Sequence, residues 1–327
     1  MQCSAVQCSA VQCDTSDESL AFRIPHPESP IPVTPRHFLL LLLICVAWGG
    51  NFLTSALALR ELPPFLFTAL RLGLVAILLL PFLRPPRRDQ WPRLVAVALL
   101  NGALHFGLSF WALQLAGNLA SPAIVMQSYI PMATVLAVLF LGERIGWKTS
   151  AGIAVSFLGV LVLGFDPVVL QAPQSLLLMQ AAAALLAIGT VLMRGLTGFT
   201  PLSQQGWSAL IGIAPLLALS AWREGAPWHA LQSASWVAWG GVIYSAAIAS
   251  VLGHGLFYWL IQRHEVSRLM PYLLLSPLFA IALGVLFHGD VLGPRLLLGG
   301  AMVLGGVLAI GLRAATRRRT PPEATEL

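Results

Sequence analysis

The chain has 327 residues, of which 57% are hydrophobic and only 10% are charged, and its mean hydropathy is +0.80. Soluble domains carry roughly 25% charged residues, so this composition excludes a soluble globular protein and indicates helices that span a membrane. The formal charge of +6 does not indicate a nucleic-acid partner, because the basic residues occupy short gaps between apolar segments instead of a patch interleaved with aromatic residues.

The first 35 residues differ from the rest of the chain. They contain a QCSAV repeat with Cys3, Cys8 and Cys13, followed by a stretch rich in acidic residues and prolines. Such a composition cannot bury enough apolar surface to fold, so we expect residues 1–35 to form a disordered tail. The cysteines lack metal-ligand spacing, and Cys45 lies within an apolar segment. The sequence therefore predicts no metal site, no redox site and no cofactor.

Ten apolar segments follow the tail, each long enough to cross the hydrocarbon core of a bilayer, which takes about 20 helical residues. Proline, glycine and charged residues mark the ends of the segments. The predicted fold class is therefore an all-α membrane protein with ten transmembrane helices. The predicted helices cover residues 37–57, 64–83, 93–115, 121–142, 147–165, 174–193, 203–222, 236–262, 267–288 and 294–313.

The basic residues predict the orientation of these helices. If the N-terminus is inside, all but four of the 19 Lys and Arg residues fall on the cytoplasmic side. The exceptions are Arg60, Arg223 and Arg295 in external loops and Arg71 within a helix. Since cytoplasmic loops carry the excess of Lys and Arg, we expect both termini to be cytoplasmic, with residues 314–327 as a basic tail. We also expect a multi-pass protein of the cell inner membrane.

Two stretches of the sequence resemble each other. Residues 139–165 align without gaps to residues 286–312, and the identical positions include four pairs of glycines. Further upstream, GLSFWALQ at residues 107–114 matches GLFYWLIQ at residues 255–262. Chance similarity among membrane glycines does not account for a matched Trp and Gln as well. The alignment therefore predicts an internal duplication.

The duplication divides the membrane part into two repeats, residues 36–166 and 167–313. Each repeat has five predicted helices, and an odd number makes the second repeat enter the membrane in the opposite sense. Inverted repeats are typical of alternating-access carriers, whose substrate site lies near the midplane between the halves. The predicted arrangement is therefore two inverted five-helix repeats around a central pathway.

Four motifs carry a resemblance to a known family: WGGNF (48–52), LR (70–71), LASPA (119–123) and LGERIGWKTSAGIAVSFLGVLVL (141–163). Together they resemble the drug/metabolite transporter superfamily, specifically its EamA branch, over roughly residues 37–313. The resemblance implies a ten-helix carrier with a central cavity lined by helices one, three, four, six, eight and nine. It also implies export of amino acids or related metabolites, although members differ in substrate.

Polar side chains at membrane depth are the candidate cavity residues, because such groups face protein or water in a bilayer. Arg71 would hold a substrate carboxylate by a charge-assisted contact. Alternatively, it snorkels to the external interface or caps the carbonyls of the first helix. Asn51 either lines the cavity or joins two helices by a hydrogen bond. The candidate set for substrate binding is Trp48, Asn51, Arg71, His105, Gln127, Tyr129, Tyr244 and Tyr272.

Two of these positions carry specific hypotheses. His105 would couple transport to protons, or it is a neutral histidine that packs two helices together. Near Gln127, Pro131 frees a backbone carbonyl that a cavity can use, and Pro277 repeats this feature in the ninth helix. The polar cluster around Gln127 either forms part of the site or packs against a neighbouring helix.

Two acidic residues have a structural interpretation instead. Glu143 and Asp290 each lie in a G-[E/D]-x-x-G turn before a helix. An acid there favours a helix N-terminus and can pair with Lys148 or Arg295. We therefore predict that these carboxylates stabilise turns.

These observations favour a secondary transporter of small metabolites, with a small-molecule substrate and the lipid bilayer as partners. Export of amino-acid-like or other small polar compounds is the preferred activity. The sequence has no Walker motif, and HEVSR (264–268) lacks the second histidine of a zinc protease, so we predict no catalytic residues and no enzyme. The alternative is a membrane receptor, scaffold or lipid-handling protein. Proton coupling and a homodimer are left open.

Overall fold

The computed structural model of the chain describes residues 34–142, 145–225, 227–261, 263, 269 and 272–318. The predicted disorder of the N-terminal tail lies outside the described residues except for Thr34 and Pro35, and the predicted role of Glu143 lies outside them as well. At the other end, the last helix continues to Arg318. Residues 314–318 of the predicted C-terminal tail are therefore helical.

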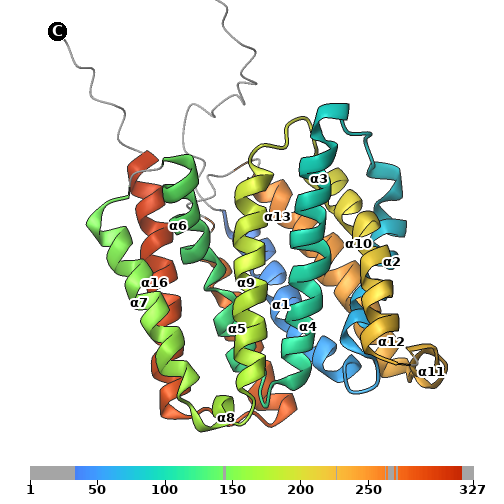
Figure 1. Ribbon diagram of the computed structural model, residues 1–327. Coiled ribbons are helices and arrows are strands. Elements are labelled where there is room, and N and C mark those ends of the chain that lie inside the picture. Colours follow the sequence, from blue (N-terminus) through green and yellow to red (C-terminus); the bar gives the residue numbers. More distant parts are fainter. Residues whose placement is uncertain are drawn as a thin grey trace, which may run out of the picture. The chain divides into compact units, whose positions relative to one another are not determined.

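All regular structure in the described residues is helical (Figure 1). Within this part of the chain, nine helices are long and apolar enough to cross a membrane, and a shorter apolar helix covers Leu275–His288. These elements agree with the ten predicted transmembrane helices. In chain order they are α1 (Pro35–Ala58), α2 (Pro64–Leu79), α3–η3–α4 (Trp91–Val97, Ala98–Leu104, His105–Leu115), α5–α6 (Ala120–Met126, Tyr129–Leu141), α7 (Trp147–Gly164), α9 (Pro173–Met193), α10 (Pro201–Arg223), α12–η4–α13 (Trp236–Ile243, Tyr244–Gly253, His254–Ile261), α15–η5 (Leu275–Leu283, Gly284–His288) and α16 (Pro294–Arg318). Two short helices, α8 (Pro167–Leu170) and α11 (Pro227–Ser233), lie between spans.

The helix starts follow from local sequence signals. Thr34 accepts the N–H of His37 at 3.3 Å ahead of α1, and Thr200 accepts the N–H of Ser203 at 3.2 Å ahead of α10. A proline follows each threonine, and its missing N–H is not needed at the first helical position. Such local signals explain why the helix bounds could be predicted to within a few residues.

The helices α7 and α16 pack closely side by side (Figure 1). A Cβ added to Gly159 would lie 2.7 Å from the carbonyl oxygen of Gly299, and one added to Gly299 would lie 2.6 Å from that of Gly159. Likewise, a Cβ on Gly152 would lie 3.0 Å from the carbonyl oxygen of Gly306. Only glycine permits so close an approach of two backbones.

These contacts also show how the halves are related. In the alignment of the repeats, Gly152 corresponds to Gly299 and Gly159 to Gly306. In the structure, Gly152 meets Gly306 and Gly159 meets Gly299, so the two helices run antiparallel and each contact has its counterpart with the halves exchanged. Such an exchange is the signature of a two-fold relation between like elements. The prediction of inverted repeats is confirmed.

The inner helices repeat this exchange. α1 packs against α12, η4 and α15, and the corresponding first helix of the second half, α9, packs against α4, η3, α5 and α6. The second helices of the two halves, α2 and α10, pack against each other. The first, third and fourth helices of both halves therefore surround the centre of the bundle.

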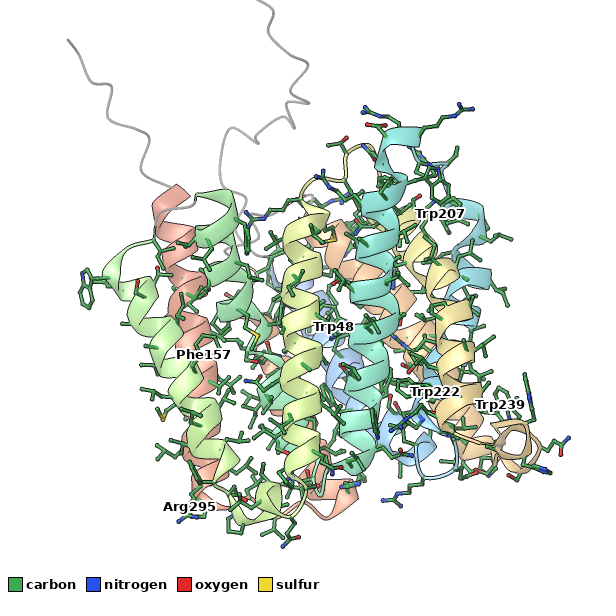
Figure 2. All side chains as sticks on the ribbon, in the orientation of Figure 1. Trp48, Phe157, Trp207, Trp222, Trp239 and Arg295 are labelled. Carbon is green, nitrogen blue, oxygen red and sulfur yellow. The ribbon has the colours of Figure 1, made fainter. Side chains whose placement is uncertain are left out.

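The outward-facing surface is that of a membrane protein. Among the exposed large apolar side chains, Ile77 is 69% exposed and Phe140 74% exposed. Figure 2 shows Trp207 near one end of the bundle and Trp222 and Trp239 near the other, whereas Trp48 lies at mid-height. Tryptophan is enriched at both interfaces of a membrane, so these positions fit helices that cross one bilayer.

Carboxylates from distant loops cap helices at the end of the bundle that holds α8 and α11 (Figure 1). Glu224 accepts the N–H groups of Phe65 at 2.6 Å and Leu66 at 3.1 Å, at the start of α2. Glu61 accepts both the N–H and the hydroxyl of Ser235 at 2.7 Å, at the start of α12. Because a helix N-terminus presents unpaired N–H groups and a positive dipole end, these acids stabilise the helix starts.

Asp290 and Asp166 do the same for two further helices. Asp290 accepts the N–H of Leu119 at 2.7 Å, just before α5, and Asp166 accepts the N–H of Leu296 at 3.1 Å in the first turn of α16. The predicted pairing of Asp290 with Arg295 is wrong, because Arg295 donates to a backbone carbonyl oxygen 2.9 Å away instead. Asp290 therefore stabilises a helix start, but it caps a helix of the other half and not its own.

Candidate functional site

A cavity of about 280 Å³ lies among the inner helices at mid-height. Its walls come from the six helices expected from the resemblance, α1, α4, α5–α6, α9, η4–α13 and α15 with the turn before it, and additionally from α2. The described residues that line it are Trp48, Asn51, Phe52, Arg71, His105, Phe106, Ser109, Phe110, Leu113, Met126, Gln127, Tyr129, Ile130, Met179, Leu186, Ala249, His254, Leu273, Leu274 and Ser276.

The structure brings six of the eight candidate residues to this cavity: Trp48, Asn51, Arg71, His105, Gln127 and Tyr129. They come from helices that are far apart in the sequence. Their convergence at one cavity is what a binding site between two halves requires.

The other two candidates do not line the cavity, and their predicted placement is corrected. Tyr244 lies against α1, with its hydroxyl 3.5 Å from the carbonyl oxygen of Val46. Tyr272 packs edge-on against Phe38, with ring centroids 5.7 Å apart, and its carbonyl oxygen accepts the Sγ–H of Cys45 at 3.3 Å. Both tyrosines therefore contribute to helix packing around α1.

Arg71 is the charged side chain of the cavity wall. It is only 3% exposed. Its Nη2 donates to the hydroxyl of Ser250 at 2.7 Å, and its Nε donates to the carbonyl oxygen of Ser245 at 3.4 Å. Nη1 is buried without a hydrogen-bond partner among the described residues. This geometry is not that of an arginine that snorkels to the membrane surface.

The backbone around Ser245 explains how α12–η4–α13 can serve Arg71. The segment Tyr244–Gly253 is a π-helix, in which the usual bonds to the fourth residue along the chain are replaced by bonds to the fifth. The carbonyl oxygen of Ser245 accepts from the hydroxyl of Ser250 at 2.6 Å as well as from Arg71. The irregular backbone thus turns a helix carbonyl toward a buried cation.

Aromatic rings cover the guanidinium of Arg71. The ring of Phe106 lies 3.8 Å from Cζ of Arg71, and that of Phe110 lies 5.6 Å away. The two rings stack on each other at an angle of 18°. A guanidinium over an aromatic face is stabilised by the ring quadrupole, so these phenylalanines partly offset the burial of the charge.

His105 is held by a backbone contact. Its Nδ1 lies 3.0 Å from the carbonyl oxygen of Ala182 on α9. Since a carbonyl only accepts, Nδ1 carries a proton, which leaves Nε2 of a neutral ring as an acceptor. The contact joins α4 to α9 across the two halves.

Trp48 and His254 form another part of the wall. The Nε1–H of Trp48 donates to the carbonyl oxygen of Ala249 at 3.0 Å, and its ring lies 5.1 Å from that of His254. His254 was outside the candidate set. It immediately precedes the GLFYWLIQ segment, as Phe106 precedes GLSFWALQ, so the internal alignment carried a signal for both.

Two interrupted helices meet at the cavity. The fourth span is broken by a turn at Gln127 and Ser128, one turn before Pro131, and the ninth is broken at Leu274, shortly before Pro277. The Ser128 hydroxyl donates to Gln180 on α9. Broken helices at membrane depth are tolerated where they are buried in protein or line a cavity, and here both breaks border the same one.

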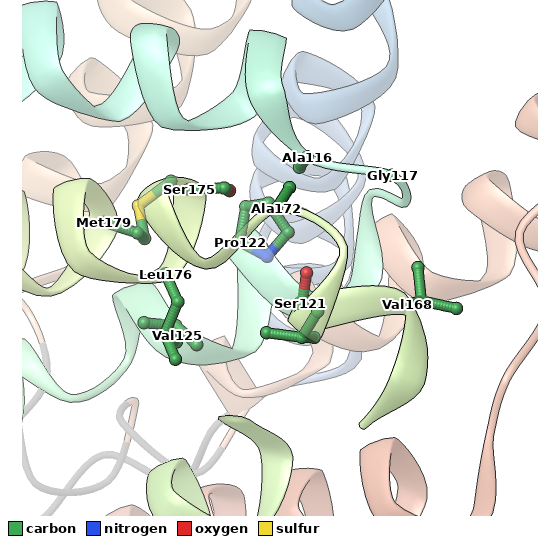
Figure 3. A pocket seen from close by; sticks show the side chains of 11 residues that line it. Ala116, Gly117, Ser121, Pro122, Val125, Val168, Ala172, Ser175, Leu176 and Met179 are labelled. Atoms are coloured by element: carbon green, nitrogen blue, oxygen red, sulfur yellow. The ribbon is translucent and has the colours of Figure 1, made fainter. Parts of the chain in front are cut away.

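A second pocket, of about 10 Å³, lies between α5, α8 and α9. Figure 3 shows that Val168, Ala172 and Ser175 border it together with Ser121 and Val125. This volume holds about one water molecule, so the pocket is too small for a metabolite. Among the described residues, no three His, Cys, Asp or Glu side chains lie together as a metal site requires.

Comparison with known proteins identifies the family. The model of the EamA-like transporter family matches residues 36–165 and 174–312. A chain of known crystal structure superposes with a TM-score of 0.54 over 86% of this chain and 98% of that one. At 22% identity this likeness shows the fold alone.

Relatives of known sequence cover 80% or more of the chain. A Salmonella typhimurium protein named "Probable amino-acid metabolite efflux pump" is 32% identical over 86% of this chain and 96% of its own length. An Escherichia coli protein of the same name is 30% identical over 80% and 90%. A Pseudomonas aeruginosa protein named "Probable biotin transporter" is 28% identical over 80% and 93%. The chain therefore belongs to the EamA-like transporter family and is a multi-pass membrane transporter.

Proposed function

We propose that this chain is a secondary transporter that exports small, amino-acid-like metabolites bearing a carboxylate across the inner membrane. Both termini lie in the cytoplasm, and the repeats 36–166 and 167–313 alternately expose the cavity to each side. The observation that carries the proposal is the buried guanidinium of Arg71 in the cavity wall, with one nitrogen lacking a partner among the described residues.

The energetics of Arg71 favour an anionic solute. A cation at the bilayer centre costs about 2.5–3.5 kcal/mol on insertion scales. In this structure Arg71 has neutral hydrogen-bond partners and aromatic neighbours. A carboxylate would add a charge-assisted hydrogen bond to a guanidinium that is already held in place.

The architecture supports alternating access. The cavity lies between inverted halves, and two broken helices border it. Rocking of one half against the other is the usual way in which such carriers move a solute past a central site. The names of two relatives, which describe efflux of amino-acid metabolites, support export as the direction.

The experiment that tests this function is an export screen in cells that express the wild-type chain, Arg71→Gln or Arg71→Lys. We expect at least about a tenfold loss of export with Arg71→Gln, since a hydrogen bond to a charged group contributes about 1.5–3 kcal/mol. Export by Arg71→Lys should fall between that of the wild type and that of Arg71→Gln. Lysine keeps the positive charge but lacks the planar guanidinium that can bond both oxygens of a carboxylate.

Arg88→Gln is the matched control, because Arg88 is exposed and lies outside the cavity. Membrane insertion is measured for every variant. Export that is equal in the wild type and in well-inserted Arg71→Gln would remove the proposed site.

A proton-coupling role of His105 is a separate hypothesis. His105→Gln should flatten the pH dependence of transport into proteoliposomes if the imidazole carries protons. An unaltered pH profile would assign His105 to helix packing through its bond to Ala182.

A further inference from the structure

The fixed charge of the cavity wall has one sign. Among the described residues that line the cavity, Arg71 is the only lysine or arginine. None of these lining residues is an Asp or a Glu. The two histidines cannot supply a negative charge in either protonation state. The other polar side chains of the wall are neutral: Trp48, Asn51, Ser109, Gln127, Tyr129 and Ser276.

The carboxylates of the bundle that could balance this charge are committed elsewhere. Asp290 and Asp166 accept backbone N–H groups at helix starts, and so do Glu61 and Glu224. None of these four lines the cavity. The unpartnered Nη1 of Arg71 therefore has no acid of the described chain within reach.

We infer that the cavity selects small carboxylates without a free ammonium group, such as N-acylated or deaminated amino acids, over zwitterionic amino acids. This inference rests on the proposed function, since it refines the solute class of the same site. A monoanion next to Arg71 brings the net charge of the occupied site to zero. A zwitterion leaves it at plus one, with its ammonium facing only neutral acceptors at membrane depth, where an uncompensated charge is costly.

The remainder of the wall suits an apolar body attached to that carboxylate. Phe52, Phe106 and Phe110 line the cavity, and so do Leu113, Met126 and Ile130. Small-molecule sites measure roughly 300–1,000 Å³, so a cavity of about 280 Å³ limits the solute to a small molecule. An amide or an absent amine fits such walls better than an ammonium does.

The test is a matched series of ligands on the purified full-length wild type, which needs no variant to fold. N-acetyl-phenylalanine and 3-phenylpropionate are monoanions, phenylalanine is a zwitterion, and phenylalanine amide is a cation. Their dissociation constants are measured by quenching of tryptophan fluorescence, with Trp48 in the cavity wall as a local reporter. We expect both monoanions to bind at least about tenfold more tightly than phenylalanine, and the amide not to bind.

The outcomes separate this inference from the proposed function. If phenylalanine binds as tightly as the monoanions while the amide does not bind, the solute class is wrong but the carboxylate site stands. If the amide binds as well as phenylalanine, or if Arg71→Gln leaves all four constants unchanged, the carboxylate site itself is contradicted.

A variant of the wall can reverse the preference. Gln127→Glu adds a carboxylate of nearly the same shape to the cavity, where it would pair with a solute ammonium or with Arg71. Either pairing lowers the preference for monoanions. We expect the ratio of the dissociation constants of phenylalanine and N-acetyl-phenylalanine to shift at least about tenfold in favour of phenylalanine. Gln232→Glu adds the same charge at an exposed end of the bundle, on α11. An equal shift in this control would overturn the local explanation.

Discussion

The glycine-packed pair α7–α16 and the helices around the cavity differ in the regularity of their backbones. The helices α7 and α16 are uninterrupted, and they meet through backbones at Gly159 and Gly299. The cavity helices contain the π-helices η3, η4 and η5 and the breaks at Gln127 and Leu274. Irregular backbone therefore occurs where protein or a cavity can satisfy the freed polar groups.

This comparison predicts opposite sensitivities. A substitution at a glycine contact between α7 and α16 should act on folding and leave no partly active protein, whereas one at the cavity should act on transport in a protein that still folds. Single substitutions can probe that distinction, beginning with the largest expected effect.

Gly299→Leu should prevent stable folding. Its Cβ would lie 2.6 Å from the carbonyl oxygen of Gly159 and 2.7 Å from the amide nitrogen of Leu163, and backbone cannot rotate away as a side chain can. Overpacking costs about 1–3 kcal/mol even where side chains can adjust, so the loss here should exceed about 3 kcal/mol. The measurement is the yield of monodisperse protein after extraction into detergent.

Gly305→Leu is its control on the same helix, since a Cβ there meets nothing within 4 Å. It should give a yield close to that of the wild type. Equal yields for the two variants would mean that the glycine contact is not what holds the halves together.

Pro131→Ala should lower transport and leave stability unchanged or higher. Alanine restores an N–H that can donate to the carbonyl oxygen of Gln127, so the fourth span can become a continuous helix. That carbonyl oxygen would then no longer be free to contact a solute. Losing one such contact, about 1 kcal/mol, lowers transport about fivefold. Pro215→Ala, inside α10 and away from the cavity, should change the transport rate little. A comparable loss in both variants would deny the break a role in transport.

Asp290→Ala should destabilise the start of α5, the first part of the broken fourth span. The variant loses the cap on the Leu119 N–H and the contact with His288, whose Nδ1 lies 2.8 Å from Asp290 Oδ1. The loss of a helix cap costs about 0.5–2 kcal/mol, which a thermal unfolding midpoint can detect. Asp89→Ala removes an exposed carboxylate paired with Arg87 and should have less effect. A midpoint equal to that of the wild type would contradict the capping role.

Glu61→Gln should produce the smallest effect, and one that depends on pH. The N–H of Ser235 and then its hydroxyl lower the pKa of Glu61 below its ordinary value of 4.5. A lowered pKa in the folded state means that the stabilisation is present above pH 4.5 and is lost as the pH falls through the lower, folded pKa. The midpoints of wild type and variant should therefore differ at neutral pH and converge in acid, below the folded pKa. A difference that persists at low pH would point to another cause.

The same comparison explains which features the sequence could predict. The thickness of the bilayer and local proline and threonine signals determine the helix bounds, so these were predicted closely. Internal alignment identified the glycines through which α7 and α16 meet, although it did not show which glycine contacts which. The depth of Arg71 and the polarity of Gln127 were also visible in the sequence, and both residues line the cavity.

The direction of a side chain beside an irregular turn could not be predicted. A π-helix adds a residue to the turn, so the regular helical period no longer gives the direction of the side chains around it. Tyr244 begins such a segment and faces Val46 on α1 instead of the cavity. Tyr272 lies just before the break at Leu274 and contacts Phe38. Depth and polarity predict that a residue is buried in the bundle, but packing decides which way it points.

The central claim, that the cavity lies on the solute pathway, is tested most directly by thiol labelling of Asn51→Cys. The native cysteines, including the buried Cys45, are first replaced by alanine. Proteoliposomes are then treated with a membrane-impermeant thiol reagent from either side, with and without a transported carboxylate. We predict labelling from both sides and protection by the carboxylate. Labelling from neither side, or labelling that a transported solute does not slow, would contradict the account.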